Sequence, residues 1–242
     1  ARIKPVELKN RQWIDRELDH APVWCSVDLR DGNQALPLPM NPEKKLNYFR
    51  LLCQVGFKEI EVSFPSASHD DFVFVRNLVE NHEIPDDVRI SVLTQARESL
   101  IQKTVESLKG LERGILHLYV ATSDLHSKFV FHKTREEVIQ MAVDGTKMVM
   151  KYLKEAGLWG KIAYEFSPEE FTDSDVHYVV EVCKAVKETW GPSRKEDFIV
   201  NLPATVERRL CFHYADMIEL FCREYPYLDE TTISVHSHND QG

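Results

Sequence analysis

The feature that most constrains the fold is a repeated alternation of short apolar segments with longer amphipathic segments. Segments with the composition of β-strands are expected at residues 23–27, 59–62, 89–93, 115–120, 161–166, 198–201 and 232–236. Segments with helical periodicity lie between them, at about residues 41–55, 70–81, 98–108, 134–156, 173–189 and 202–223. Strands that alternate with helices indicate a parallel sheet covered by helices, so the sequence predicts an α/β fold.

About seven β/α units at similar spacing favour a closed TIM barrel over an open sheet, which is the alternative. A complete (β/α)8 barrel has about 250 residues, whereas this chain of 242 residues stops at Gly242, just after the seventh strand. We therefore expect a barrel that lacks its last unit, in a sequence that is part of a longer protein. The expected division is an N-terminal helical segment, residues 1–20, followed by a partial TIM-barrel catalytic domain, residues 21–242. Within the first segment, a short amphipathic helix is expected over residues 6–20.

Local signals set several of the expected boundaries. Asn41 precedes a proline and has the type of a helix N-cap, and Gly56 has the type of residue that ends a helix. Thr134 and Glu137 have the spacing of a capping box, which predicts the start of a long helix. Gly32 suits a tight turn that needs a positive φ.

Composition argues against several classes of function. The net charge of −9 argues against a surface that binds nucleic acid, because such a surface needs clustered Lys and Arg side chains. The 5 cysteines are odd in number and lack Cys-x-x-Cys spacing, as expected for reduced thiols in a reducing compartment. No apolar run approaches about 18 residues, so no membrane span is expected. We expect a cytoplasmic protein, and an organellar form stays open because the chain does not begin with Met.

Charged and polar side chains gather where the predicted strands end. In β/α barrels the reactive side chains lie at the carboxyl ends of the strands. That rule selects Asp28, Arg30, Asp31, Glu61, His117, Glu165, Asn201, Thr205, His236 and His238. Their concentration at one rim of the barrel predicts an active site.

His236 and His238 form a His-x-His pair at the end of the seventh strand. Alternate residues of a strand point to the same side, so both imidazoles are expected to face the mouth of the barrel. Asp31 follows the first strand, which neighbours the last strands in a barrel, and its carboxylate would complete a facial set of metal ligands. A divalent metal is therefore predicted, and a structural His-x-His pair is the alternative.

Other side chains each have two interpretations. Arg30 is either an ion-paired rim residue or a fixed donor to an oxygen that gains negative charge. Glu165 is either a salt-bridged carboxylate or a general acid/base. Thr205, expected near a helix N-terminus, is either a cap or part of a seat for a substrate carboxylate. Asp28 is either a second carboxylate of the site or, as we expect, finishes the first strand with Ser26 in a hydrogen-bonded network.

Several longer motifs resemble those of one enzyme family. They are Val27-Asp28-Leu29-Arg30-Asp31-Gly32-Asn33-Gln34-Ala35-Leu36, Gly56-Phe57-Lys58-Glu59-Ile60-Glu61-Val62, Phe64-Pro65-Ser66-Ala67-Ser68, Asn201-Leu202-Pro203-Ala204-Thr205-Val206-Glu207 and His236-Ser237-His238-Asn239-Asp240. Together they resemble the signatures of the long-form 2-isopropylmalate synthases across nearly the whole chain. That family belongs to a superfamily of metal-dependent barrels with homocitrate synthase, citramalate synthase and hydroxymethylglutaryl-CoA lyase.

The resemblance implies an acyltransferase that condenses acetyl-CoA with 2-oxoisovalerate. The products are 2-isopropylmalate and CoA, in the first committed step of leucine biosynthesis. By similarity, Asp31, His236 and His238 would bind the divalent metal, for which Zn²⁺, Mg²⁺ and Mn²⁺ are the candidates. The metal would chelate the oxoacid and polarise its keto group as a Lewis acid.

The resemblance also implies roles for four other side chains. Arg30 would stabilise the alkoxide as the carbon–carbon bond forms, and Thr205 would hold the oxoacid carboxylate. Glu165 would be a candidate acid/base, and His117 would line the substrate pocket. The family usually has a further metal-ligating Asn, a helical subdomain that supplies a partner-chain His, and a leucine-binding regulatory domain, all beyond Gly242. We therefore expect a homodimer of the full-length protein, and little or no activity from these residues alone.

Two alternatives stay open at this point. One is a homocitrate or citramalate synthase of the same superfamily, which would use 2-oxoglutarate or pyruvate. The other is a metal-binding barrel fragment without activity. Both keep the fold and the metal ligands, and they differ from the main interpretation in the oxoacid that the protein turns over.

Overall fold

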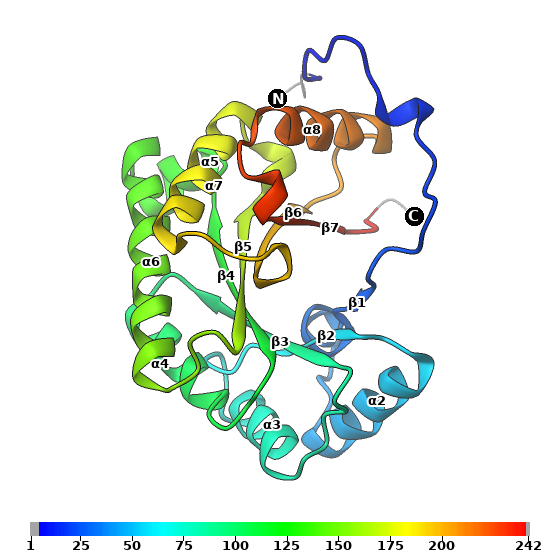
Figure 1. The fold of residues 1–242 in the computed structure, drawn as a ribbon, viewed down its shortest axis with the longest axis vertical. Helices are drawn as coiled ribbons and strands as arrows, with labels where there is room; N and C mark the ends of the chain where they lie inside the picture. Colours follow the sequence, from blue (N-terminus) through cyan, green and yellow to red (C-terminus); the bar gives the residue numbers. More distant parts are fainter. Residues whose placement is uncertain (1–4, 241–242) are drawn as a thin grey trace. The chain divides into compact units, whose positions relative to one another are not determined.

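The computed structural model describes residues 5–240, and its strands and helices alternate as predicted (Figure 1). The strands are β1 (Cys25–Ser26), β2 (Glu59–Ser63), β3 (Arg89–Gln95), β4 (Gly114–Ala121), β5 (Ile162–Glu169), β6 (Phe198–Ala204) and β7 (Thr232–Ser237). The longer helices are α2 (Pro42–Val55), α3 (His69–Glu80), α4 (Glu98–Ser107), α6 (Arg135–Glu155), α7 (Val176–Trp190) and α8 (Cys211–Glu224). The shorter helical segments are η1 (Trp13–Asp15), η2 (Asp28–Gly32), α1 (Asn33–Ala35), α5 (Asp124–His126), η3 (Ser127–Phe131), η4 (Phe171–Asp173), η5 (Lys195–Asp197) and η6 (Leu228–Glu230). The seven strands pair in chain order in one sheet, as the predicted β/α units require.

None of the helices within residues 5–240 combines the length and the apolar character that a membrane crossing requires.

Two compact units share the chain, and each is described by itself. Unit 2 consists of Ala21–Leu118 and Lys147–Tyr164, and it contains β1, β2 and β3 with their helices. Unit 1 consists of Ala1–His20, Tyr119–Thr146 and Glu165–Gly242, and it contains β6, β7, α7 and α8. The strands β4 and β5 run from one unit into the other.

In unit 2, the strands β1, β2 and β3 pair in parallel, and α2, α3 and α4 bury their apolar side chains. Cys25 lies opposite Glu59, and the register between β2 and β3 shifts between Glu61 and Ser63. The buried side chains of the three helices include Phe49, Leu52, Phe74, Val75, Leu78 and Ile101. Each such side chain contributes about 1.5–3 kcal/mol when it is fully buried. The shift begins at Glu61, and bulges change the direction of the side chains around them.

The predicted helix boundaries are confirmed at both capping signals. The Asn41 side chain accepts a hydrogen bond from the Lys44 amide at 2.9 Å, at the start of α2. Gly56 ends that helix with a φ of 108°. At the start of α6, the Thr134 amide donates to Glu137 Oε2 at 2.8 Å, and the Glu137 amide donates to Thr134 Oγ1 at 3.3 Å. These contacts satisfy polar groups that have no partner within the helix itself.

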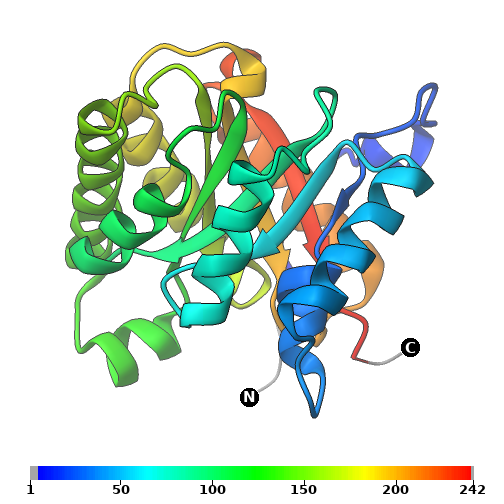
Figure 2. The ribbon, with the colours of Figure 1, turned by 90° about the horizontal axis from the view of Figure 1, so that it is seen from below.

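In unit 1, β6 and β7 pair in parallel up to Ala204, which lies opposite Ser237. The two strands lie side by side in orange and red in Figure 2. Helices α7 and α8 pack against each other, and Phe171 meets Phe221 of α8 edge-on, with ring centroids 6.2 Å apart. The register places the carboxyl ends of β6 and β7 next to each other.

The helix expected over residues 6–20 does not form. Only the short turn η1 lies there, and the Leu18 side chain is 83% exposed. An amphipathic helix gains most of its stability by burying its apolar face, and this segment does not bury that face. The segment is held against α8 instead (Figure 1), where Asp216 accepts hydrogen bonds from Arg11 Nε at 2.6 Å and Trp13 Nε1 at 2.9 Å.

Candidate active site

The segment after β1 in unit 2 forms one wide helical turn, η2. Ser26 Oγ donates to Asp28 Oδ2 at 2.6 Å, which confirms the network expected at the end of this strand. Leu29 is fully buried and anchors the turn in the core. Gly32 has a φ of −58°, so the prediction of a positive φ is wrong, because the residue continues the helical turn.

The turn directs Arg30 towards two carboxylates. Its Nε donates to Glu61 Oε1 at 2.5 Å, and its Nη1 donates to Asp31 Oδ1 at 2.8 Å. The Arg30 side chain is only 10% exposed, so both charge-assisted hydrogen bonds are largely shielded from water. Arg30 is therefore ion-paired, and the two pairs fix the orientation of its guanidinium group.

Glu61 is the centre of this cluster. Its Oε2 lies 2.6 Å from His117 Nδ1, and Ser91 Oγ donates to the same oxygen at 3.4 Å. Burial alone would raise the pKa of the Glu61 carboxyl, but Arg30 and His117 outweigh burial and hold the pKa below its ordinary value of 4.5. The ionised carboxylate only accepts hydrogen bonds, so Nδ1 of His117 carries the proton of that contact.

Sequence reasoning placed Glu61 among the polar residues at strand ends but did not assign it a role in the site. In unit 2 it is the residue that joins Arg30 to His117. The signal was a Glu between Ile60 and Val62, inside an otherwise apolar strand. A carboxylate at a buried strand position needs a cation or a hydrogen-bond donor, so its presence indicates a partner on a neighbouring strand.

In unit 1, His236 and His238 lie at the carboxyl end of β7. Their ring centroids are 5.0 Å apart. Both residues are partly buried, whereas Val235 and Ser237 are exposed, so the two imidazoles lie on one face of the strand. The His238 amide donates to the Ala204 carbonyl at 3.4 Å, which extends the pairing with β6. Two imidazoles on one strand face are suitable donors for a divalent metal.

Thr205 follows β6 directly in unit 1, beside the end of β7. The expectation that it lies at a helix N-terminus is wrong, because Pro203 continues the strand and α8 begins only at Cys211. The Thr205 hydroxyl oxygen accepts a hydrogen bond from the Glu170 amide at 3.0 Å. The Thr205 hydroxyl is thus oriented by the residue that follows β5. The amides at the N-terminus of α8 begin six residues later, at Cys211.

Glu165 lies within β5, and the residue is 8% exposed. Two residues further along, Ser167 Oγ donates to Asn201 Oδ1 at 3.0 Å, and Asn201 Nδ2 donates to Ser234 Oγ at 2.9 Å. These hydrogen bonds tie β5, β6 and β7 of unit 1 to one another. The strand ends that carry Thr205 and the two histidines are therefore held in a fixed register.

The residues predicted for the site fall into two groups. Unit 2 contains Arg30, Asp31 and His117. Unit 1 contains Glu165, Thr205, His236 and His238. Within unit 2, Glu61 contacts Arg30 and His117, and Arg30 also contacts Asp31. Within unit 1, Thr205 lies beside the histidine pair on adjacent strand ends.

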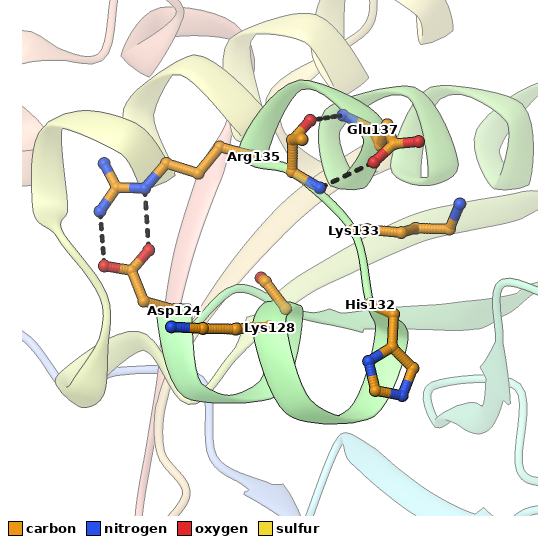
Figure 3. A pocket seen from close by; sticks show the side chains of 8 residues that line it. Asp124, Lys128, His132, Lys133, Arg135 and Glu137 are labelled. Atoms are coloured by element: carbon orange, nitrogen blue, oxygen red, sulfur yellow. Dashed lines mark hydrogen bonds and ion pairs between the residues drawn. The ribbon is translucent and has the colours of Figure 1, made fainter.

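Unit 1 also has a hollow of about 660 Å³ between the segment after β4 and the start of α6 (Figure 3). It is lined by Asp124, Ser127, Lys128, His132, Lys133, Thr134, Arg135 and Glu137. Asp124 accepts two hydrogen bonds from Arg135, each at 2.9 Å, so its charge is matched. The amino groups of Lys128 and Lys133 point in opposite directions in Figure 3, so they do not converge on one anion. We assign no ligand to this hollow.

A family model described as HMGL-like matches residues 21–242. The chain belongs to the HMGL-like family. Curated 2-isopropylmalate synthases of Clostridium acetobutylicum and Saccharomyces cerevisiae are 48% and 49% identical to it over 238 and 241 residues. These matches cover 98% of the HMGL-like chain but 43% and 38% of the relatives, so the chain spans about two fifths of their length.

Solved structures share the fold of the HMGL-like chain. The HMG-CoA lyase of Bacillus subtilis matches with a TM-score of 0.66 at 19% identity, over 91% of this chain and 70% of that chain. The HMG-CoA lyase of Brucella melitensis matches with a TM-score of 0.62 at 18% identity, over 88% and 71%. At such low identity the likeness shows the fold alone, and it confirms the predicted TIM-barrel fold with seven strands present.

Proposed function

We propose that the protein is a 2-isopropylmalate synthase of leucine biosynthesis. The observation that carries the proposal is the identity of 48–49% to curated synthases from a bacterium and a yeast, spread over 98% of the chain. In the proposed reaction, the methyl carbon of acetyl-CoA attacks the keto carbon of 2-oxoisovalerate. Water then hydrolyses the thioester, which releases 2-isopropylmalate and CoA.

Asp31, His236 and His238 are the proposed ligands of a divalent metal. The histidine rings lie 5.0 Å apart on one face of β7, and one carboxylate with two imidazoles is a donor set that suits Zn²⁺, Mg²⁺ or Mn²⁺. When bound, such an ion polarises the keto group of the oxoacid as a Lewis acid. Arg30 donates to Asp31 Oδ1 at 2.8 Å and so orients this carboxylate, as partners of metal ligands commonly do.

Arg30 supplies the positive charge for the oxygen that becomes an alkoxide in the proposed reaction. Its guanidinium is already fixed by Glu61 and Asp31, so little reorganisation is needed when the charge develops. His117 Nδ1 contacts the other carboxylate oxygen of Glu61, Oε2, at 2.6 Å, and His117 lines the substrate pocket in this proposal. The buried carboxylate of Glu61 thus orients both Arg30 and His117.

Thr205 binds the oxoacid carboxylate in this proposal, and Glu165 acts on acetyl-CoA. The Thr205 hydroxyl oxygen accepts a hydrogen bond from the Glu170 amide at 3.0 Å. The hydroxyl proton of Thr205 is therefore directed to another acceptor. Glu165 takes a proton from the acetyl methyl group as general base. Because Glu165 is only 8% exposed, little water competes for that proton.

The proposed state of the full-length enzyme is a homodimer in the cytoplasm. This part of the proposal is supported by the resemblance to the synthases. Sedimentation velocity on the full-length protein measures the oligomeric state directly, and a monomer at micromolar concentration would contradict the dimer.

A thiol-release assay on the full-length protein tests the proposed function. CoA is measured with acetyl-CoA and either 2-oxoisovalerate, 2-oxoglutarate or pyruvate, with and without a chelator. We expect CoA release that needs the metal and is fastest with 2-oxoisovalerate. A preference for another oxoacid would change the substrate but keep the HMGL-like fold, and no CoA release with any of them would overturn the proposal.

A further inference from the structure

Glu170 follows β5 in unit 1 with a backbone conformation that is uncommon for a residue with a side chain. Its φ is 61° and its ψ is 33°, in the left-handed region. Residues other than glycine are strained there and persist only where their surroundings hold them. Such positions occur preferentially at functional sites. The contacts of Glu170 therefore indicate which functional residue its strained backbone positions.

The amide, the carbonyl and one carboxylate oxygen of Glu170 each have a partner in unit 1. Its amide donates to Thr205 Oγ1 at 3.0 Å, and its carbonyl accepts from Ser174 Oγ at 2.8 Å. Its carboxylate Oε2 accepts a hydrogen bond from Ser123 Oγ, and His126 Nδ1 lies 3.6 Å from the same oxygen. These partners follow β4, β5 and β6, so Glu170 connects three strand ends.

The amide of Glu170 determines how the Thr205 hydroxyl can act. A hydroxyl group has one proton to donate and two lone pairs that accept. Because the Glu170 amide occupies an acceptor position, the Thr205 proton points away from Glu170. Within residues 5–240, the structure gives that proton no acceptor on the protein. A hydroxyl in this state is ready to donate to a carboxylate oxygen of a ligand.

We propose that Glu170 is a positioning residue for Thr205. Its carboxylate, held by Ser123 and His126, keeps the backbone in the left-handed conformation. The amide then holds the Thr205 hydroxyl so that its proton faces the oxoacid carboxylate. Glu170 itself does not touch the substrate, and this inference rests on the proposed function, in which Thr205 binds that carboxylate.

Two substitutions at Glu170 separate the backbone from the side chain. Glu170→Ala removes the carboxylate contacts and keeps a side chain that disfavours a positive φ, so the amide can leave Thr205. Glu170→Gly removes the same contacts but adopts a positive φ without strain, so the amide can stay. On the full-length protein we expect Glu170→Ala to raise the KM for 2-oxoisovalerate about tenfold and Glu170→Gly about threefold.

The KM for acetyl-CoA and the melting temperature serve as readouts that separate positioning from a structural role. We expect both to stay close to the wild-type values in Glu170→Ala. Glu224→Ala is the matched control, because it also removes a carboxylate paired with a histidine, His177 Nδ1 at 2.7 Å, on the surface of unit 1. That control is expected to leave both KM values unchanged.

A double substitution tests whether Glu170 acts through Thr205. Thr205→Val removes the hydroxyl, so adding Glu170→Ala to it is expected to raise the oxoacid KM no further. An additional tenfold rise in the double variant would show that Glu170 acts elsewhere and would overturn the inference.

The remaining outcomes are also decisive. An oxoacid KM that is the same in wild type and Glu170→Ala would overturn this inference and leave the proposed function intact. A rise of both KM values together with a lower melting temperature would overturn it as well, because that pattern reports damage to the fold. A wild-type protein that releases no CoA with 2-oxoisovalerate would overturn the proposed function, and this inference with it.

Discussion

Glu61 illustrates how one buried carboxylate organises other charged groups in unit 2. The residue is 2% exposed, and its two oxygens lie 2.5 Å from Arg30 Nε and 2.6 Å from His117 Nδ1. A buried charge is tolerated only when it is paired, so each member of this cluster depends on the others. Loss of the Glu61 charge would remove one of the two carboxylates that pair with Arg30, and the pair with Asp31 would remain.

Glu61→Gln keeps the shape of the side chain and removes its charge. We expect the free energy of unfolding to fall by about 2–4 kcal/mol, because Arg30 keeps a buried charge with one carboxylate fewer. We expect kcat to fall at least about tenfold, because the guanidinium loses its fixed orientation. Urea denaturation and CoA release measure the two effects.

Glu59→Gln is the control for this prediction. Glu59 lies on the same strand, and Arg89 Nε donates to its Oε1 at 3.1 Å outside the Arg30 cluster. We expect this variant to lose stability but to keep its kcat. If Glu61→Gln were as active as Glu59→Gln, the cluster would have no role in orienting Arg30.

Predictions about single residues succeeded where the partner is near in the sequence. Asn41 caps its own helix, and Ser26 bonds to Asp28 two residues away. The partners of Glu61 are 31 and 56 residues away. Their meeting depends on how strands align and where a bulge lies, and residue types along one strand do not determine either.

Among the elements, β4 needs a glycine where it begins in unit 2. A Cβ at Gly114 would lie 2.6 Å from Leu111 Cδ2 and 3.2 Å from the Ile90 carbonyl oxygen. The leucine side chain can move, but the carbonyl belongs to β3 and is fixed by the sheet. The close approach of β3 and β4 therefore leaves no room for a side chain.

Gly114→Ala is expected to lower the free energy of unfolding by about 1–3 kcal/mol through overpacking. Thermal denaturation measures the change. Gly32→Ala is the control, because Gly32 has a φ of −58° and a Cβ there would lie 3.8 Å from Asp28 Cβ, an ordinary contact. Equal melting temperatures for the two variants would contradict the steric account of β4.

A buried carboxylate of α8, Asp216, binds two side chains of the N-terminal segment in unit 1. The Asp216 side chain is fully buried, and it accepts hydrogen bonds from Arg11 Nε at 2.6 Å, Arg11 Nη2 at 2.7 Å and Trp13 Nε1 at 2.9 Å. The hydrogen bond from Arg11 is the main cause that holds the pKa of Asp216 below its ordinary value of 3.8.

Asp216→Asn is expected to lower the free energy of unfolding by about 1–3 kcal/mol at neutral pH. A lowered pKa in the folded state means that the ionised carboxylate stabilises the protein above the ordinary value of 3.8, and that this contribution is lost as the pH falls below it. The difference between wild type and variant should therefore shrink in urea titrations taken from about pH 6 to about pH 2. A difference that stays constant with pH would contradict this account.

Among the elements, helix starts that are set by a local cap were predicted correctly, whereas helix positions that depend on packing were not. The starts of α2 and α6 were correct because a cap involves residues within one turn. The helix expected over residues 6–20 failed because its apolar residues found no surface to cover. The start expected at Thr205 failed because Pro203, a common first residue of helices, lies in a strand here.

For the whole molecule, the repeated alternation of strands and helices was sufficient to predict the barrel fold. Each period is a local pattern, and parallel strands joined by helices have few ways to pack. The rule that reactive residues lie at carboxyl ends of strands then selected Arg30, Asp31, Thr205 and the histidines of β7. The hydrogen bonds that orient these groups, such as those of Glu170, follow from the packed structure and have no equivalent in the sequence pattern.

In the proposed function, the full-length protein forms a carbon–carbon bond between an acetyl group and 2-oxoisovalerate with the help of a bound metal. The most direct test of this claim is identification of the product by mass spectrometry. The full-length protein is incubated with a divalent metal, 2-oxoisovalerate and acetyl-CoA labelled with carbon-13 in both acetyl carbons. We predict 2-isopropylmalate that carries both labelled carbons, an equal amount of CoA, and neither product after the metal is removed. Labelled acetate in place of labelled 2-isopropylmalate would contradict the claim, because the protein would then hydrolyse the thioester without forming the new bond.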